Sequence, residues 1–218
     1  MSMPPSCRDR LDRTQLEGAA HLMAEYAWNR IGFGAELAIV SGTRMAGWAL
    51  GAAPEPYSAR YTLTTDESWA TASLEISTEG AGWTRSLRLV RQSGRDAWKI
   101  RTSETGALAG PPPGSEYPET LTDAVDVDIA FSPLTNTLPI RRLNLREQPV
   151  GTEFDLTFAF VELPSLAVVA SDQKYVVAGP GEIGFRSGDY RVQLAVDDDG
   201  FVVDYPGLAT RSTDRSRA

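Results

Sequence analysis

The stretch YSARYTLTTD, residues 57–66, alternates between two kinds of side chain and indicates the fold class. Large or apolar side chains occupy every second position from Tyr57 to Leu63, and polar side chains fill the positions between them. This period of two is typical of an antiparallel strand that buries one face.

The same alternation recurs along the chain, in WTRSLRLVRQ (83–92), TEFDLTFAFVEL (152–163) and DYRVQLAVD (189–197). Turn-forming clusters such as EGAG and DDDG separate these runs. We therefore expect an all-β fold, with about a dozen or more strands in one large curled antiparallel sheet or open barrel. The Pro- and Gly-rich stretch 103–124, with its centre at 110–117, predicts a long loop between two halves of that sheet.

The N-terminal residues have a different pattern. Thr14 and Glu17 are spaced as a capping box, and TQLEGAAHLM (14–23) has the periodicity of one short helix. The predicted organisation is an N-terminal extension over residues 1–25, a β domain over 26–211 and a disordered tail over 212–218.

Composition excludes several classes of protein. The chain carries 21 Lys and Arg against 29 Asp and Glu, a net charge of −8, which argues against nucleic-acid binding and a polybasic membrane anchor. Cys7 is the single cysteine, so no internal disulfide can form. No apolar run approaches the length of a membrane span, and no leader pattern precedes Cys7, so a cytoplasmic location is expected.

Few residues suggest catalysis or metal binding. His21 is the single histidine, so histidine-based catalysis and multi-histidine metal sites lack partners. Asp126 and Asp128 would share one face of a strand, where they could act as an acid/base pair or hold a cation. A solvated strand face is the favoured interpretation, and we expect neither a metal site nor a cofactor.

The segment FSPLTNTLPIRRL (131–143) predicts a stiff corner. Pro133 and Pro139 would fix the backbone, and Asn136 could bond its own backbone or adopt a left-handed conformation. In an extended chain Arg141 shares a face with the leucines that follow, which predicts a buried pair with Asp126 or Asp128. Replacing Arg141 should then cost more stability than replacing the solvent-facing Arg142. The alternative role for Arg141 is contact with the polar head of a ligand.

Four segments carry a resemblance to a known family: DVDIAFSPLTNTLPIRRLNL (126–145), YTLTTDESWAT (61–71), LPSLAVVASDQKY (163–175) and VDDDGFVVDYPGLATR (196–211). On these segments the chain resembles the bacterial family called putative glycolipid-binding proteins, over about residues 26–211. The resemblance implies a large curled antiparallel β structure, similar to lipid carriers of the bacterial envelope.

The resulting hypothesis is non-catalytic binding of an amphiphile, with a glycolipid as the implied ligand, inside the curled sheet. Arg141 would meet the head group together with Gln173 and Tyr175, which match the family's Gln-x-Tyr pattern. Large aromatic side chains would line the space, including Trp69, Tyr61 and Trp48. The net charge favours a neutral sugar head group. The alternatives are a packed β interaction protein without a ligand, and a hydrolase-type enzyme that uses Asp66, Asp126 or Asp128. The sequence indicates no oligomeric state.

Overall fold

The computed structural model describes residues 23–32, 34–92 and 98–212. Within these ranges fourteen strands form one sheet, in the spatial order β7-β6-β5-β4-β3-β2-β1-β14-β13-β12-β11-β10-β9-β8. The first seven strands are β1 (Ala24–Arg30), β2 (Gly34–Ser41), β3 (Arg44–Gly51), β4 (Tyr57–Thr65), β5 (Thr71–Gly80), β6 (Trp83–Arg91) and β7 (Trp98–Thr105). The others are β8 (Asp126–Ile129), β9 (Glu153–Val161), β10 (Val168–Gly179), β11 (Glu182–Ser187), β12 (Tyr190–Val196), β13 (Val202–Tyr205) and β14 (Ala209–Arg211).

Neighbouring strands are antiparallel with one exception. β8 pairs in parallel with β9, in the register Asp126–Phe158 to Ile129–Val161. A parallel pair needs a crossover connection, and residues 130–152 supply it with η4 (Leu134–Asn136), α1 (Thr137–Arg142) and η5 (Leu145–Glu147). The expectation of an antiparallel sheet is therefore wrong at this edge.

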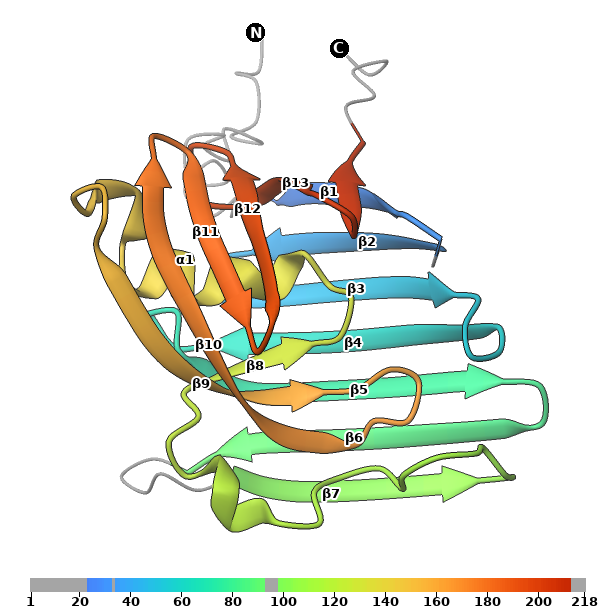
Figure 1. The fold of residues 1–218 in the computed structure, drawn as a ribbon. Coiled ribbons are helices and arrows are strands. Elements are labelled where there is room, and N and C mark those ends of the chain that lie inside the picture. The colour runs from blue at the N-terminus through green and yellow to red at the C-terminus, as the bar shows by residue number, and fades with distance from the viewer. Residues whose placement is uncertain (1–22, 33, 93–97, 213–218) are drawn as a thin grey trace, which may run out of the picture.

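The sheet curls without closing, since β7 and β8 remain at opposite ends of the strand order. Figure 1 shows the strands β9–β12 crossing in front of the wall made by β2–β6, with α1 and β8 between them. Apolar residues of this middle layer join both cores. Leu134 and Leu138 pack in the core cluster that contains the buried residues of β1–β7 and parts of β8–β10, whereas Ile140 and Leu145 pack in the cluster of β9–β13. The crossover segment thus occupies the concave side of the sheet.

The alternation in 57–66 is confirmed as strand β4, with Tyr57, Ala59, Tyr61 and Leu63 buried on the concave face. Gly47 lies opposite Tyr61 in the register of β3 and β4. A Cβ on Gly47 would lie 2.0 Å from the Tyr61 ring. Glycine at this position therefore lets the tyrosine ring lie flat across the neighbouring strand.

The predicted long loop lies between β7 and β8, with η3 (Pro118–Leu121) near its end. It is held in place by Arg85, whose side chain is almost fully buried. The Arg85 guanidinium donates to the carbonyl oxygens of Pro111 at 2.5 Å, Ser165 at 3.0 Å and Leu108 at 3.2 Å. One buried cation therefore ties the loop to the turn between β9 and β10.

The predicted N-terminal helix over residues 14–23 lies almost wholly outside the described residues, and Met23 is not helical. β1 begins at Ala24, two residues before the predicted start of the β domain. In the described part of the chain no helix is long and apolar enough to cross a membrane.

Candidate functional site

The corner at 131–143 is helical rather than extended. Pro133 precedes η4, and Pro139 is the third residue of α1, where a missing backbone N–H is tolerated. Asn136 has right-handed helical angles, and Asn144, beyond the helix, is the residue in the left-handed region at φ +50°. The strand-based assignment of faces to Arg141 and Arg142 is therefore wrong.

Arg142 makes the buried ion pair that had been expected of Arg141. Its Nε and Nη2 atoms donate to Asp126 Oδ2 at 3.0 and 2.7 Å, and the Asp126 side chain is only 1% exposed. Burial raises the pKa of Asp126, and the guanidinium of Arg142 opposes that rise. The prediction that Asp126 lies on a solvated strand face is therefore wrong, because Asp126 is buried and pins α1 to β8.

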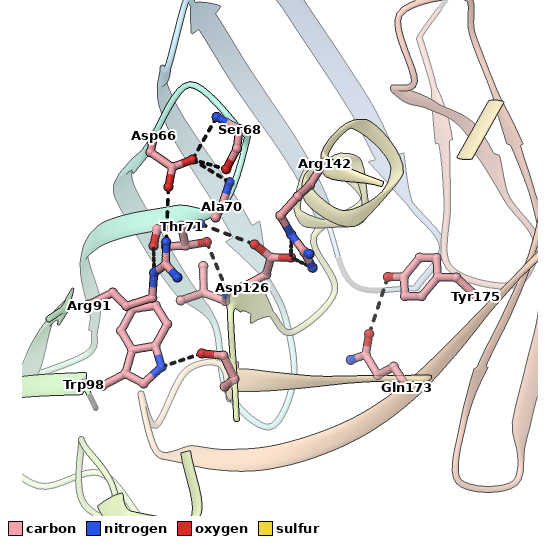
Figure 2. A network of polar contacts seen from close by, with 12 residues as sticks. Asp66, Ser68, Ala70, Thr71, Arg91, Trp98, Asp126, Arg142, Gln173 and Tyr175 are labelled. Atoms are coloured by element: carbon pink, nitrogen blue, oxygen red, sulfur yellow. Dashed lines mark hydrogen bonds and ion pairs between the residues drawn. The ribbon is translucent and has the colours of Figure 1, made fainter. Parts of the chain in front are cut away.

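A polar network extends from this pair to the loop between β4 and β5, as Figure 2 shows. The backbone N–H of Thr71 donates to Asp126 Oδ1 at 3.3 Å, and the Thr71 carbonyl accepts from Arg91 Nε at 2.8 Å. Arg91 Nη2 also contacts Asp66 Oδ2 at 3.2 Å. The helix that carries the two arginines is therefore coupled to the segment 66–70 through hydrogen bonds.

Asp66 organises that segment rather than standing free as a catalytic carboxylate. Its Oδ1 atom accepts from the Ser68 hydroxyl at 2.6 Å and from the backbone N–H groups of Ser68 at 2.9 Å and Ala70 at 3.1 Å. The Ser68 hydroxyl is the main cause of the lowered pKa of Asp66. Inside this clamp Trp69 has φ +69°, a conformation that costs a bulky L-residue about 1–2 kcal/mol. Backbone strain of this kind is enriched at functional sites, and Trp69 is one of four described non-glycine residues that have a positive φ.

Trp69 contacts Arg141 at the C-terminal end of α1. The Arg141 guanidinium carbon lies 4.1 Å from the centroid of the Trp69 ring and 5.7 Å from that of Phe201. Arg141 Nη1 also donates to the carbonyl oxygen of Asp199 at 2.9 Å. Stacking and this hydrogen bond hold the planar guanidinium in one orientation.

A hollow of about 230 Å³ opens beside this pair. Its walls come from the Trp69 loop, from α1 and η5, and from the β12–β13 turn; besides Trp69 and Arg141 they include Asn144, Arg146, Glu147, Asp198 and Asp199. The turn has the predicted Asp-rich form, in which Asp197 Oδ1 accepts from the backbone N–H groups of Asp199 and Phe201. Arginine donors and carboxylate acceptors therefore line one hollow beside an aromatic ring.

Gln173 and Tyr175 lie in a separate buried network. Gln173 Nε2 donates to Asp128 Oδ2 at 2.7 Å, and the Tyr175 hydroxyl donates to Asn136 Oδ1 at 3.0 Å. Burial raises the pKa of Asp128 to about 6, against the opposing effect of hydrogen bonds from Gln173 and Thr135. The structure therefore does not join these residues to Arg141 in one open space.

Tyr61 is also buried. Its hydroxyl donates to Glu36 Oε1 at 2.5 Å, and the same oxygen accepts from Ser132 at 2.6 Å. Trp48 lies on the convex face with 41% of its surface exposed, so the expectation that it faces the interior is wrong. Of the predicted ligand-contacting residues, the structure brings Arg141 and Trp69 together. No pattern in the sequence signals the Trp69 strain, because φ depends on how the loop is clamped.

These features describe a half-open curled-sheet protein with a small polar hollow at one end of its crossover helix. The family model described as putative glycolipid-binding matches residues 35–211, and the chain belongs to this family. A crystal structure of a DUF1089 family protein from Pseudomonas aeruginosa is similar, with a TM-score of 0.66 and 24% identity. That similarity covers 81% of this chain and 91% of the other, and it supports the fold. No curated protein matches the chain.

Proposed function

We propose that the protein binds the neutral sugar head group of an amphiphile in the hollow between Trp69 and Asp199. The observation that carries the proposal is the guanidinium of Arg141, which is stacked on a strained tryptophan at the wall of that hollow. An arginine has five N–H donors, and among the described residues the hydrogen bond to Asp199 occupies only Nη1. Donors on Nε and Nη2 can therefore serve a ligand.

The charges around the hollow favour a neutral polyhydroxyl group. Two cations, Arg141 and Arg146, face three carboxylates, Glu147, Asp198 and Asp199. Arg146 is already engaged by Asp198, at 2.7 Å from Oδ1. A phosphate would meet uncompensated carboxylates here, whereas sugar hydroxyls can accept from Arg141 and donate to the acids. The membership of a family described as glycolipid-binding points to the same class of ligand.

The size of the hollow supports a head group, rather than the whole lipid, as the ligand of this site. A volume of about 230 Å³ lies below the range of about 300–1,000 Å³ in which pockets enclose a drug-sized ligand. The concave side of the sheet is occupied by the crossover segment, and Tyr175 and Gln173 are 1% and 4% exposed there. We therefore place the ligand at the end of α1 rather than inside the curl.

The proposed role is binding without catalysis. Each carboxylate of the rival hydrolase-type hypothesis has a structural role, since Asp66 shapes the Trp69 loop, Asp126 pairs with Arg142, and Asp128 bonds Gln173. Asp66 lies in the loop between β4 and β5, Asp126 and Asp128 lie in the buried networks, and none of these three carboxylates lines the hollow.

The proposal is tested by calorimetric titration of a short-chain alkyl glycoside below its micelle concentration. We expect saturable binding that Trp69→Ala and Arg141→Gln each weaken at least tenfold, which corresponds to about 1.4 kcal/mol. The matched controls are Trp48→Ala and Arg186→Gln, which change an exposed tryptophan and an exposed arginine away from the hollow. An alkyl phosphate of equal chain length should bind more weakly. Equal losses in the control variants, or preference for the phosphate, would refute the proposal.

A further inference from the structure

The convex face of the sheet carries an exposed apolar patch on β2 and β3. Leu37, Trp48 and Leu50 are 45%, 41% and 60% exposed. Leu37 lies directly opposite Trp48 in the register, and Leu50 follows Trp48 by two residues, so the three share one face. Large apolar side chains grouped on a solvent-facing sheet indicate an interaction surface.

Cations continue the same face across β4–β7. Arg60 pairs with Trp48 in the register of β3 and β4, and Arg88 pairs with Arg101 in that of β6 and β7. A hollow of about 500 Å³ lies among these arginines, and it is lined by Arg60, Arg88 and Arg101 and by short side chains such as Ser77 and Ser86. The result is a shallow trough of hydroxyl groups bordered by three exposed guanidinium groups.

The charge of this face is opposite to that of the whole chain. On β3–β7 the convex face carries five cations, Arg44, Arg60, Arg88, Lys99 and Arg101, and two carboxylates, Glu75 and Glu79. Glu75 pairs with Arg88 at 3.2 Å, while Arg60 and Arg101 have no ion-pair partner among the described residues. The net charge of −8 is a sum over the whole chain, and this part of the convex face is locally positive.

We propose that this convex face docks on an anionic lipid surface. Leu37, Trp48 and Leu50 would enter the interfacial layer, where tryptophan is favoured, and Arg60 and Arg101 would contact head-group phosphates. The proposal goes beyond sugar binding and uses none of the residues of the Trp69 hollow.

Charge and apolar character together select this partner over others. A second copy bound through the same face would oppose two surfaces that each carry five cations and only two carboxylates, which is repulsive. A soluble polyanion would use the arginines but would leave the apolar patch in water. An anionic bilayer satisfies both features, because its surface combines negative charge with an apolar layer beneath it.

The test is co-sedimentation of the full chain with vesicles of mixed phosphatidylglycerol and phosphatidylcholine, with pure phosphatidylcholine vesicles as the reference. We expect binding to the anionic vesicles only, and a loss of binding when salt is raised to about 0.5 M, where screening is strong. The double variant Arg60→Gln/Arg101→Gln should reduce partitioning about 25-fold, since each cation near an anionic surface contributes about fivefold. Trp48→Ser should reduce it about tenfold.

Matched controls lie on the other half of the sheet. Arg186→Gln/Arg191→Gln removes an exposed cross-strand arginine pair, and Tyr190→Ser removes an aromatic side chain with 46% exposure. Both controls should partition like the unaltered protein. Equal binding to both vesicle types, equal losses in the controls, or no binding at all would overturn the proposal. So would a Trp48-dependent dimer in gel filtration, or binding that needs the arginines but not Trp48.

Discussion

Replacement of Arg142 by alanine should be among the most destabilising changes at the crossover helix. The variant leaves the carboxylate of Asp126, which is 1% exposed, without the two hydrogen bonds at 2.7 and 3.0 Å. Removing one member of a buried pair costs about 3–5 kcal/mol. Because Arg142 is 16% exposed and Thr71 still donates to Asp126, we expect the lower end, about 3 kcal/mol.

Arg141→Ala should cost less, because Arg141 loses a cation–π contact and one hydrogen bond near solvent, worth about 1–2 kcal/mol together. Urea unfolding followed by circular dichroism measures both variants. With an m-value of about 3 kcal/mol per M, the Arg142 variant should shift the midpoint by about 1 M. The control Arg88→Ala removes an exposed pair and should change stability by less than about 1 kcal/mol.

The pH dependence gives an independent check on the same pair. Without Arg142 the pKa of the buried Asp126 should rise further, since the group that lowered it is gone. The carboxyl can then escape the cost of burial by binding a proton. The stability deficit of Arg142→Ala should therefore be larger at pH 8 than at pH 5. Equal midpoints for the Arg141 and Arg142 variants, or a deficit that grows on acidification, would refute this account of the corner.

Three further results are expected. In the unaltered protein the free energy of unfolding should fall by up to about 3 kcal/mol as pH rises from about 4 to 6, because the folded pKa of Asp128, about 6, exceeds the unfolded value. Asp128→Asn should abolish this fall, and urea titrations of both proteins measure the difference. Trp69→Gly should be about 1 kcal/mol more stable than Trp69→Ala, since glycine relieves the positive φ, and melting curves that rank alanine first would contradict the strain. Arg85→Ala should cost about 3 kcal/mol and expose residues 106–117 to proteinase K, unlike Arg88→Ala; an uncut loop would remove the anchoring role of Arg85.

Strand positions could be predicted because each strand repeats its pattern locally. β4 carries the period of two over its whole length, so burial on one face follows from the sequence, whereas β6 places the charged Arg85 on its buried face. The parallel pairing of β8 with β9 could not be predicted in this way. β8 has four residues, and its pairing partner depends on a crossover segment whose helix is only six residues long.

The prediction for the corner at 131–143 was wrong for a related reason. The run TLPIRR is too short to show a helical period, and reading it as extended chain exchanged the roles of two adjacent arginines. A helix turns by about 100° per residue, so Arg142 reaches Asp126 while Arg141 stacks on Trp69. Arg142 lies 16 residues from Asp126 and Gln173 lies 45 residues from Asp128, and periodicity alone does not identify such pairs. Strand parity selected Arg141 and side-chain size selected Trp69 as candidate ligand contacts, but their contact with each other depends on the tertiary structure.

The measurement that tests the central claim most directly is a ¹H–¹⁵N NMR titration that follows the indole N–H groups of the five tryptophans with an alkyl glycoside. Trp28 and Trp98 serve as internal references, because their indole groups are buried donors to the carbonyls of Val202 and Ala124. We predict a saturable shift of the Trp69 resonance, assigned with Trp69→Phe, at ligand concentrations below about 1 mM, equivalent to about −4 kcal/mol. A Trp69 signal that stays in place while the glycoside binds elsewhere, or no saturable shift of any indole, would contradict the account.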